Sequence, residues 1–326
     1  MINLVSKIKS ISLRNFSINI YYLFKHNLKS LRQENRQELE SKLFHLRSRL
    51  LYFELLSYFT KKVNSDFQRE ISYIKELGQV TVFPYKQLKT LQNIEAGFDE
   101  VKKLPFVIHR NKRLYFPKAW SVEQVIMTYK NYIEVENILG GNYTEKAPHK
   151  YQSSTVHVKE GDIVLDIGAS EALFALDIID LAKKVLIFEP ESIWDEPLKA
   201  TFQPYKDKVK IFKKYLSNID SSKEIKLEAC LKDEDFQSMF IKMDIEGFEK
   251  KIIEWNKPLF IKNIDLRITC CTYHEQNDAD NINLMLNDYG YKTEFSEGYM
   301  LYIYDENLKP PYFRKGMIRA FRILQQ

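Results

Sequence analysis

From Gly161 onward, short apolar runs rich in β-branched residues alternate with segments that have helical spacing. This alternation is typical of a mostly parallel sheet that is covered by helices. We expect strands at residues 162–167, 185–189, 208–212, 239–244 and 263–270, and an antiparallel pair near 291–295 and 299–304. We expect helices at residues 171–183, 194–203, 247–255 and 279–289. The second half of the chain is therefore predicted to be an α/β domain with an open sheet.

An amphipathic helix is predicted between Leu31 and Thr60, where apolar residues recur at spacings of three and four. The apolar stripe comprises Leu39, Leu43, Leu46, Leu50, Phe53 and Leu56. Residues 1–70 carry thirteen Lys and Arg against six Asp and Glu, so this extension is the basic part of the chain. The helix either packs on the body of the protein, or pairs with a second copy of itself, or lies on an acidic membrane surface.

A segment with hairpin and helix signals follows the extension. The runs 106–110 and 113–116 flank a two-residue turn, which predicts a β-hairpin with His109 at its surface. Ser121 can cap a helix that runs to Ile138, because its hydroxyl can accept from the first backbone N–H groups. We therefore divide the chain into a basic helical extension at 1–70, a helix and hairpin entry module at 71–150, and a third domain at 151–326.

The charge and the cysteine content of the chain limit its possible cellular compartments and the classes of partner that it can bind. The net charge of +5 is too small to indicate nucleic acid without a concentration of basic residues on one face, so no nucleic-acid partner is expected. Two of the three cysteines are adjacent, which fits neither a disulfide framework nor a Cys-x-x-Cys metal clamp. No run approaches the roughly 18 uninterrupted apolar residues that a spanning helix needs. We expect a cytoplasmic protein, either free or peripheral at the inner membrane face.

The first strand of the α/β region ends in Asp166-Ile-Gly-Ala-Ser-Glu-Ala, and a helical stripe follows at once. A strand, a glycine-containing turn and a helix form a ligand-binding corner in an open α/β sheet. Gly168 lets the backbone come close to a ligand, and Asp166 can accept a hydrogen bond from a ligand ammonium. A dinucleotide site needs several glycines here, whereas this turn has one glycine and a carboxylate, Glu171, at the helix entry. A pyrophosphate ligand is therefore disfavoured.

Acidic residues also end the second and fourth strands. Glu189 lies about twenty residues beyond the first turn, where an acidic side chain can take both hydroxyls of a ribose. Asp244 and Glu246 end the fourth strand, and side chains two positions apart in a strand point to the same side. They can hold a cationic ligand or accept a proton, although Glu246 also fits the first turn of a helix.

These segments, in their order and spacing, resemble the FkbM family of methyltransferases, whose mark is a segment of Lys, Asp, Glu and Gly. The segments are Asp166-Ile-Gly-Ala-Ser-Glu, Phe188-Glu-Pro-Glu and Phe240-Ile-Lys-Met-Asp-Ile-Glu-Gly-Phe-Glu. The likeness runs from Tyr151 to Ile303 and departs from the family at Ala172, where a glycine is usual. The resemblance implies a class I, Rossmann-like sheet of seven mostly parallel strands with an antiparallel last strand. It also implies S-adenosyl-L-methionine as methyl donor and O-methylation, often of sugars in glycans or secondary metabolites.

The pattern and the resemblance together give a predicted site. The cofactor-binding residues are Asp166, Gly168, Ala169, Ser170, Glu171, Glu189, Asp244 and Glu246. His274, at the end of the fifth strand, is the first candidate for the base that takes the acceptor proton, and Asp244 is the second. A lone histidine at a strand end is otherwise a structural hydrogen-bonding residue. Asp244, Glu246 and His274 could converge on a metal, but three ligands from separate segments are a weak signal, so no metal is expected.

The sequence thus predicts an S-adenosyl-L-methionine-dependent O-methyltransferase that acts on a hydroxyl of a small molecule or glycan, in a setting such as polysaccharide biosynthesis. One alternative is a non-catalytic methyltransferase-fold interaction module, in which Ala172 weakens the cofactor site. The other is an NAD-dependent oxidoreductase, which the missing glycines disfavour. Cofactor binding distinguishes the three.

Overall fold

The computed structural model describes residues 33–62, 66–232, 234 and 236–322. Contacts group the chain into two compact units, one comprising Met1–Pro84 with Leu301–Phe313 and the other Tyr85–Met300 with Arg314–Gln326. These limits differ from the predicted division at residues 70 and 150, and that division stays a prediction. The first 32 residues of the predicted extension lie outside the described residues.

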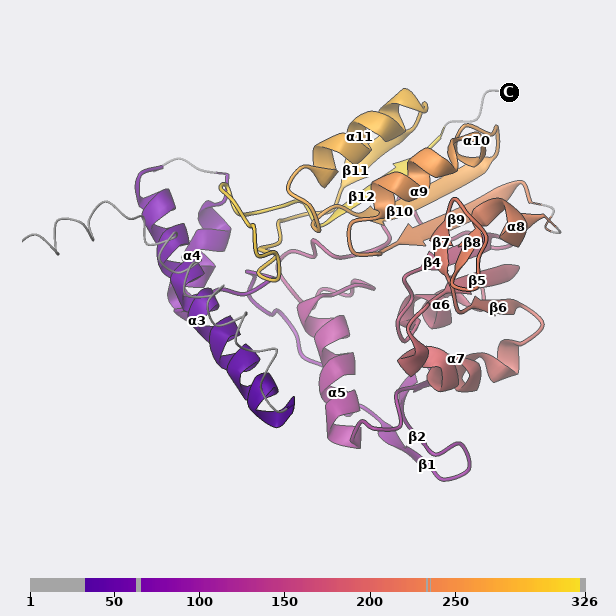
Figure 1. The fold of residues 1–326 in the computed structure, drawn as a ribbon, viewed down its shortest axis with the longest axis horizontal. Helices are drawn as coiled ribbons and strands as arrows, with labels where there is room; N and C mark the ends of the chain where they lie inside the picture. Colours follow the sequence, from indigo (N-terminus) through magenta and orange to yellow (C-terminus); the bar gives the residue numbers. More distant parts are fainter. Residues whose placement is uncertain (1–32, 63–65, 233, 235, 323–326) are drawn as a thin grey trace, which may run out of the picture. The chain divides into compact units, whose positions relative to one another are not determined.

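The larger unit is built on a seven-stranded sheet with the strand order β11-β12-β10-β9-β4-β5-β6 (Figure 1). Its strands are β4 (Ile163–Ile167), β5 (Lys184–Phe188), β6 (Val209–Phe212), β9 (Ser238–Met243), β10 (Asp265–Cys271), β11 (Lys292–Phe295) and β12 (Met317–Phe321). Five neighbouring strands, β10, β9, β4, β5 and β6, are parallel to one another. Strand β12 is antiparallel to both of its neighbours, β10 and β11. The predicted class, a mostly parallel Rossmann-like sheet of seven strands with an antiparallel last strand, is confirmed.

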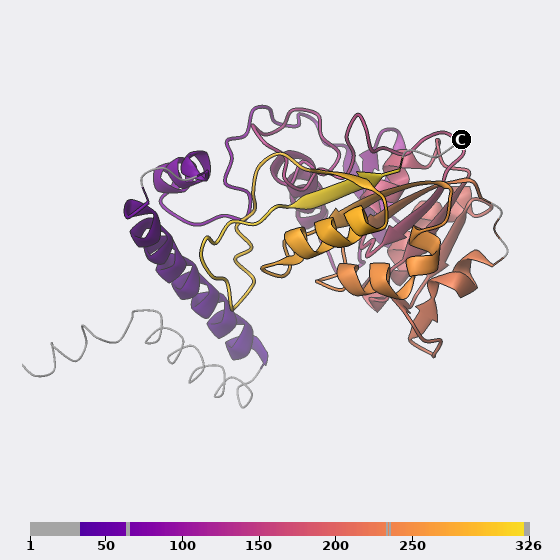
Figure 2. The same cartoon turned by 90° about the horizontal axis from the view of Figure 1, so that it is seen from above.

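Helices cover this sheet on its two faces, and the orange helices of Figure 2, α9 to α11, lie along one of them. The helices of the α/β region are α6 (Leu173–Ile178), α7 (Asp195–Phe202), α8 (Leu227–Leu231), α9 (Glu249–Trp255), α10 (Lys257–Phe260) and α11 (Asp278–Asp288). Short 3₁₀ turns occur at η2 (Ser192–Trp194) and η3 (Gln203–Tyr205), and a small two-stranded sheet pairs β7 (Tyr215–Ser217) with β8 (Glu224–Lys226). Ile252 of α9 and Leu286 of α11 share one buried apolar cluster with Ile268 of β10.

The opposite face of the central strands carries polar groups. Leu266, Ile268 and Cys270 belong to the apolar cluster, and side chains alternate along a strand, so Arg267 and Cys271 project to the other face. Arg267 is buried there and pairs with Asp162 at 2.6 Å. Buried charges persist only when they are paired and hydrogen-bonded. This face therefore combines fixed polar contacts with apolar packing.

One predicted strand is wrong. Residues 299–304 form no strand in the described chain, apart from an isolated bridge between Met300 and Arg314. The antiparallel partner of β11 is β12, at Met317–Phe321. Leu301–Phe313 instead belongs to the smaller unit, where the Leu301 N–H donates to the Val82 carbonyl oxygen at 3.0 Å. The alternation of Leu301 and Ile303 with tyrosines imitates a strand, but the backbone partners lie elsewhere.

The predicted hairpin is confirmed, and it carries a third strand. The strands are β1 (Ala96–Asp99), β2 (Leu104–His109) and β3 (Lys112–Tyr115). Ser121 caps α5 (Val122–Lys130) in a reciprocal capping box with Gln124. The helix then widens into the π-helical turn η1 (Asn131–Val135) before the predicted end at Ile138. His109 is buried rather than exposed, because its ring nitrogens contact the Tyr129 hydroxyl and the Asp177 carboxylate, each at 2.9 Å.

The smaller unit contains α3 (Gln33–Thr60) and α4 (Gln68–Leu77), so the predicted helix is present. Its buried residues are Leu43, Leu51, Leu55 and Phe59, whereas Leu46 and Phe53 of the predicted stripe are exposed. The register differs because aromatic side chains of the 301–313 segment meet the helix, with Phe313 against Phe59 at 5.8 Å between ring centroids. No helix in the described part of the chain has both the length and the apolar character needed to cross a bilayer.

Candidate functional site

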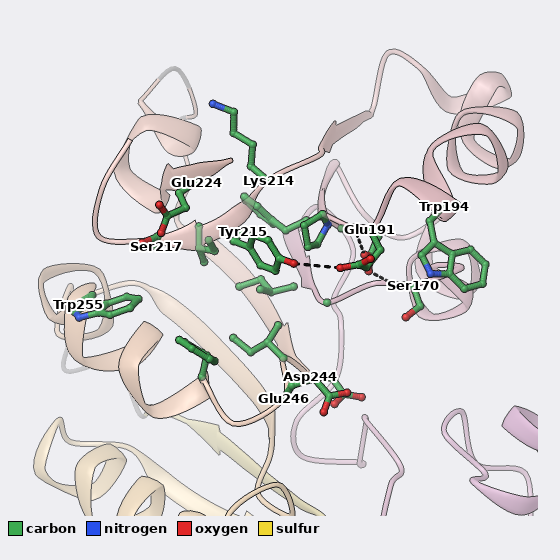
Figure 3. Close-up of a pocket in the computed structure, with 18 residues that line it drawn as sticks. Ser170, Glu191, Trp194, Lys214, Tyr215, Ser217, Glu224, Asp244, Glu246 and Trp255 are labelled. Carbon is green, nitrogen blue, oxygen red and sulfur yellow. Dashed lines mark hydrogen bonds between the residues drawn. The ribbon is translucent and has the colours of Figure 1, made fainter. Parts of the chain in front are cut away.

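A cavity of about 570 Å³ lies beyond the carboxyl ends of β4, β5 and β9 (Figure 3). Loops at this edge of an open α/β sheet bind its ligands. Its volume is within the range of small-molecule and cofactor sites, roughly 300–1,000 Å³. In Figure 3, Trp255 and Glu224 lie on one side of the cavity and Glu191 and Trp194 on the other. The lining includes Gly168, Ser170, Phe188, Glu189, Glu191, Trp194, Lys214, Tyr215, Leu216, Ser217, Asp244, Glu246, Phe248 and Trp255.

Gly168 brings the turn after β4 against the loop after β9. Its φ of +74° is in the left-handed region, and a Cβ built on it would stand 1.9 Å from the carbonyl oxygen of Asp244. Any side chain at this position would therefore force the two loops apart. The Asp244 N–H donates to the Ile167 carbonyl oxygen at 3.1 Å, which holds the same approach from the other side.

Glu189 follows β5 and is buried at the cavity wall. Its Oε2 accepts from the Ser170 N–H at 2.7 Å, and its Oε1 accepts from the Glu191 N–H at 2.8 Å (Figure 3). Burial raises the pKa of Glu189, against the opposing effect of the two N–H groups. Each carboxylate oxygen keeps a further lone pair, so the group can still accept from two neighbouring ligand hydroxyls. This arrangement fits the ribose of a nucleoside-like cofactor.

The turn between β4 and α6 keeps its shape through unusual backbone angles. Ser170 has φ +48° and Ala172 has φ +60°. Ser170 lines the cavity, whereas Ala169 and Ala172 are buried and do not. A left-handed conformation costs an alanine roughly 1–2 kcal/mol. The departure from the family's glycine at Ala172 therefore strains the backbone and places no methyl group in the cavity.

Glu171, in the same turn, is buried behind the cavity wall and does not line the cavity. Burial raises its pKa to about 7, against the opposing charge of Lys242 and a hydrogen bond from Tyr132. Tyr132 belongs to the π-helical turn after α5. An extra residue in a π-turn redirects the side chains that follow it, and such turns occur often at functional sites. This turn thus brings polar groups of the entry module to the first loop of the sheet.

Asp166 and Lys242 are register partners on β4 and β9. Their side chains form a buried ion pair, with Lys242 Nζ at 3.0 Å from Asp166 Oδ1. Lys242 Nζ also donates to the Gly168 carbonyl oxygen at 2.5 Å. Burial alone would lower the pKa of Lys242, but Asp166 and Asp244 raise it above its ordinary value. Asp166 does not line the cavity, so the structure places it beneath the turn.

The Asp244 carboxylate contacts two histidines and two tyrosines on this face of the sheet. Its Oδ2 lies 3.2 Å from His149 Nε2 and accepts from the Tyr151 hydroxyl at 3.3 Å. Its Oδ1 accepts from the Tyr273 hydroxyl at 3.1 Å and lies 3.6 Å from His274 Nε2. Burial alone would raise the pKa of Asp244, but the hydrogen bond and charge of His149, with Lys242 and His274, hold it well below its usual range.

Each histidine beside Asp244 has a second carboxylate behind it. His149 Nδ1 lies 2.9 Å from Glu136 Oε2, and His274 Nδ1 lies 3.1 Å from Glu249 Oε1. Burial alone would lower the pKa of His149, but its bonds to Asp244 and Glu136 raise it to about 9. Burial alone would also lower the pKa of His274, but Glu249 and Asp244 raise it above its ordinary value. Each ring therefore lies between two carboxylates.

Only some of the site residues predicted from the sequence line the cavity. The cavity is lined by Gly168, Ser170, Glu189, Asp244 and Glu246, whereas Asp166, Ala169, Glu171 and His274 lie behind its wall. Glu246 is the exposed member, and its Oε2 lies 3.9 Å from His274 Nε2. The roles assigned to these residues stay predictions. Sequence reasoning gave no role to His149, Lys242, Glu136 and Glu249, although Lys242 and Glu249 stood inside a segment that carried the resemblance.

No family model matches the chain, and no curated protein matches it. Among solved structures, the FkbM methyltransferase of Methylobacillus flagellatus is 16% identical over 52% of this chain and 46% of that chain, with a TM-score of 0.40. The putative tRNA (m1A22) methyltransferase Sp1610 of Streptococcus pneumoniae, in complex with S-adenosyl-L-methionine, is 16% identical over 52% of this chain and 69% of that chain, with a TM-score of 0.34. The likeness concerns the fold of class I methyltransferases and does not assign the chain to the FkbM family.

The exclusion of nucleic acid as a partner is wrong. An rRNA methylase from Streptococcus thermophilus is 12% identical over 52% of this chain and 90% of that chain, with a TM-score of 0.35, and two other similar structures are described as a tRNA and an RNA methyltransferase. A net charge summed over the whole chain gives no information on the charge around one cavity.

The close approach at Gly168 predicts a difference between two glycines. Gly168→Ala should destabilise the protein by about 2–5 kcal/mol, because left-handed strain adds to the displacement of packed backbone. Gly161→Ala is the matched control, since Gly161 has φ +84° and no atom within 4 Å of its would-be Cβ. It should lose only the strain, about 1–2 kcal/mol. Urea unfolding measures both, and equal losses would contradict the role of Gly168.

The raised pKa of Glu171 predicts a pH-dependent effect on stability. Its pKa is about 7 in the folded protein against an ordinary 4.5, so its stabilising proton is fully bound below pH 4.5 and lost as pH rises through 7. Glu171→Gln stays neutral, so its stability relative to the parent should rise by on the order of 3 kcal/mol between pH 4.5 and pH 8. Glu191→Gln, on an exposed side chain, should leave the parent's pH dependence intact. Denaturant unfolding across this range tests it, and a flat difference for Glu171→Gln would refute the burial argument.

Proposed function

We propose that this chain is an S-adenosyl-L-methionine-dependent methyltransferase. The observation that carries the proposal is the Glu189 carboxylate, which is buried at the cavity wall and held by two backbone N–H groups. It leaves acceptor positions for two hydroxyls beside Gly168, which lines the same cavity. A ribose with an uncharged sugar edge suits this pair of features. When bound, the cofactor would supply an electrophilic methyl group on a sulfonium.

The charge around the turn favours a cationic cofactor over a dinucleotide. Glu189 and Asp244 both line the cavity, and the Asp244 carboxylate is held ionised by its neighbours. A pyrophosphate would meet these carboxylates, whereas the sulfonium and ammonium of S-adenosyl-L-methionine would be attracted to them. The NAD-dependent alternative is therefore the weaker one. A non-catalytic module is also less well supported, because the Ala172 methyl group does not line the cavity.

The acceptor that we infer is a hydroxyl of a sugar, in a glycan or a small molecule. Aromatic side chains line the cavity at Tyr215, Phe248 and Trp255, and all three are exposed. Exposed aromatic faces can stack on the apolar faces of sugar rings. Lys214 and Glu224 lie among them and can bind hydroxyl groups. Polysaccharide biosynthesis is a setting that would supply such a substrate.

For the proton of the acceptor we propose His274, with Asp244 beside it. His274 lies behind the cavity wall, and its Nε2 faces the two carboxylates that follow β9, at 3.6 Å from Asp244 and 3.9 Å from Glu246. In-line transfer would form the bond from the acceptor oxygen to the methyl carbon as the carbon–sulfur bond breaks, and the proton would pass to the ring nitrogen. Positioning of the two reactants would supply most of the rate.

Cofactor binding tests the proposal directly. The full chain should bind S-adenosyl-L-methionine or its demethylated product in calorimetry, and Glu189→Ala should weaken binding by about 1–3 kcal/mol through the loss of hydrogen bonds to ribose. Glu191→Ala is the control, because this exposed residue lines the same cavity without holding the turn. Binding of NAD, together with no heat from either methionine nucleoside, would transfer the assignment to an oxidoreductase.

The base assignment has its own pH signature. His274→Ala should lower methyl transfer from labelled cofactor to sugar acceptors by about 10²–10⁴-fold, with cofactor affinity nearly unchanged. An imidazolium cannot accept a proton, so the parent's rate should fall as pH drops through the pKa of His274, which Glu249 and Asp244 raise from its ordinary value. This fall should be absent in the variant. Normal turnover in His274→Ala with an unchanged pH profile would remove the residue from the mechanism.

A further inference from the structure

Two clusters in the described part of the chain bring three metal-binding side chains together. One contains His149, Asp244 and Cys271, and the other contains Asp244, Glu249 and His274. Within each cluster the donor atoms lie within 4.8 Å of one another. Asp244 belongs to both, and His149 faces its Oδ2 while His274 faces its Oδ1.

The His274 cluster is poorly arranged for an ion. The ring of His274 turns Nδ1 to Glu249 at 3.1 Å and Nε2 to Asp244 at 3.6 Å. These nitrogens are on opposite edges of the imidazole, so an ion bound to either nitrogen lies away from the carboxylate on the other edge. Glu249 also accepts the Ile245 N–H at 2.9 Å. The arrangement is a hydrogen-bonded chain from acid to imidazole to acid.

The His149 cluster is arranged differently, because one ring nitrogen faces both of the other donors. His149 Nε2 lies 3.2 Å from Asp244 Oδ2 and 3.6 Å from Cys271 Sγ. Tetrahedral zinc with usual bond lengths sets its nitrogen, oxygen and sulfur ligands about 3.3–3.6 Å apart. The distances from His149 Nε2 to Asp244 Oδ2 and to Cys271 Sγ are therefore close to the edges of a zinc tetrahedron before any ion is bound.

The surroundings of His149 have the second feature of a metal site. A histidine that binds a metal through one ring nitrogen usually donates the other N–H to a carboxylate, which fixes the ring orientation. His149 Nδ1 lies 2.9 Å from Glu136 Oε2 on the far side of the ring. The ring also meets Tyr151 and Tyr273 edge to face, with centroids 5.3 and 5.4 Å away. Glu136 thus fixes the ring from the side opposite to Asp244 and Cys271.

We propose that His149, Asp244 and Cys271 form a binding site for one zinc ion. A nitrogen, an oxygen and a sulfur donor are a set that zinc accepts, and three protein ligands leave its fourth position open to a water or substrate oxygen. Asp244 also lines the cavity (Figure 3), so the site lies at the cavity's edge. The proposal departs from the expectation that no metal is bound. It does not rest on the proposed function, because metal binding is measured without methyl transfer.

Zinc binding by the full chain tests the site. Protein stripped with a chelator should take up one zinc ion with a Kd below about 1 µM, measured by competition with a chelating dye. Cobalt(II) should give a thiolate charge-transfer band in the near ultraviolet, which reports a cysteine ligand. Cys271→Ser should abolish this band and weaken zinc binding at least 100-fold. His149→Gln should weaken zinc binding to a similar extent, and Glu136→Gln should weaken it by about 10–100-fold.

Cys270→Ser is the matched control, because this buried cysteine is the next residue of β10 and faces the apolar cluster instead. It should bind zinc as the parent does and keep the cobalt band. Circular dichroism and thermal melting establish that each variant is folded. No stoichiometric zinc in the parent, or an equal loss in the two serine variants, would overturn the proposal. A cobalt complex of the parent without a thiolate band would overturn it as well.

Discussion

The turn that forms one wall of the cavity depends on the buried ion pair between Lys242 and Asp166. The two side chains are neighbours on the central strands, 3.0 Å apart, and the ammonium also bonds to the carbonyl oxygen of Gly168. Removing one partner of a buried pair leaves an uncompensated charge, which costs about 3–5 kcal/mol. Two contacts therefore fix the position of the turn after β4. One is the hydrogen bond from Lys242 to the Gly168 carbonyl oxygen, and the other is the close packing of Gly168 against the Asp244 backbone.

Asp244 extends this arrangement from the sheet to the segments around it. It takes contacts from His149 and Tyr151, which precede the sheet, and from Tyr273 and His274, which follow β10. Low dielectric strengthens each contact, and it would equally penalise any of these groups left alone. One carboxylate thus joins three stretches of chain that are far apart in sequence. Its environment keeps it ionised, which suits attraction of a cation more than uptake of a proton.

The fold could be predicted from the sequence wherever the hydropathy pattern of a segment matches the burial of its side chains in the structure. The parallel strands are buried on both faces and were recognisable as apolar runs, but β12 was missed because Arg319 interrupts it. That arginine is buried because it donates to the carbonyl oxygens of Lys150 and Tyr151, partners that no local pattern reveals. His149 was missed for the same reason. It lies in a loop without periodicity, and long-range contacts of Pro148 with Ser296 and Gly316 bring it to the site.

The backbone angles of the turn after β4 have a consequence for how a ligand is received. Gly168, Ser170 and Ala172 all have positive φ, a sequence of conformations that a free chain would rarely visit. Folding of the sheet has already restricted this segment, so a ligand does not have to immobilise it. The entropy loss that usually accompanies loop closure on a small molecule is then largely absent. The binding site at this edge of the sheet is therefore preorganised. Its shape and charge set the selectivity for a ligand, and the loop does not have to change conformation on binding.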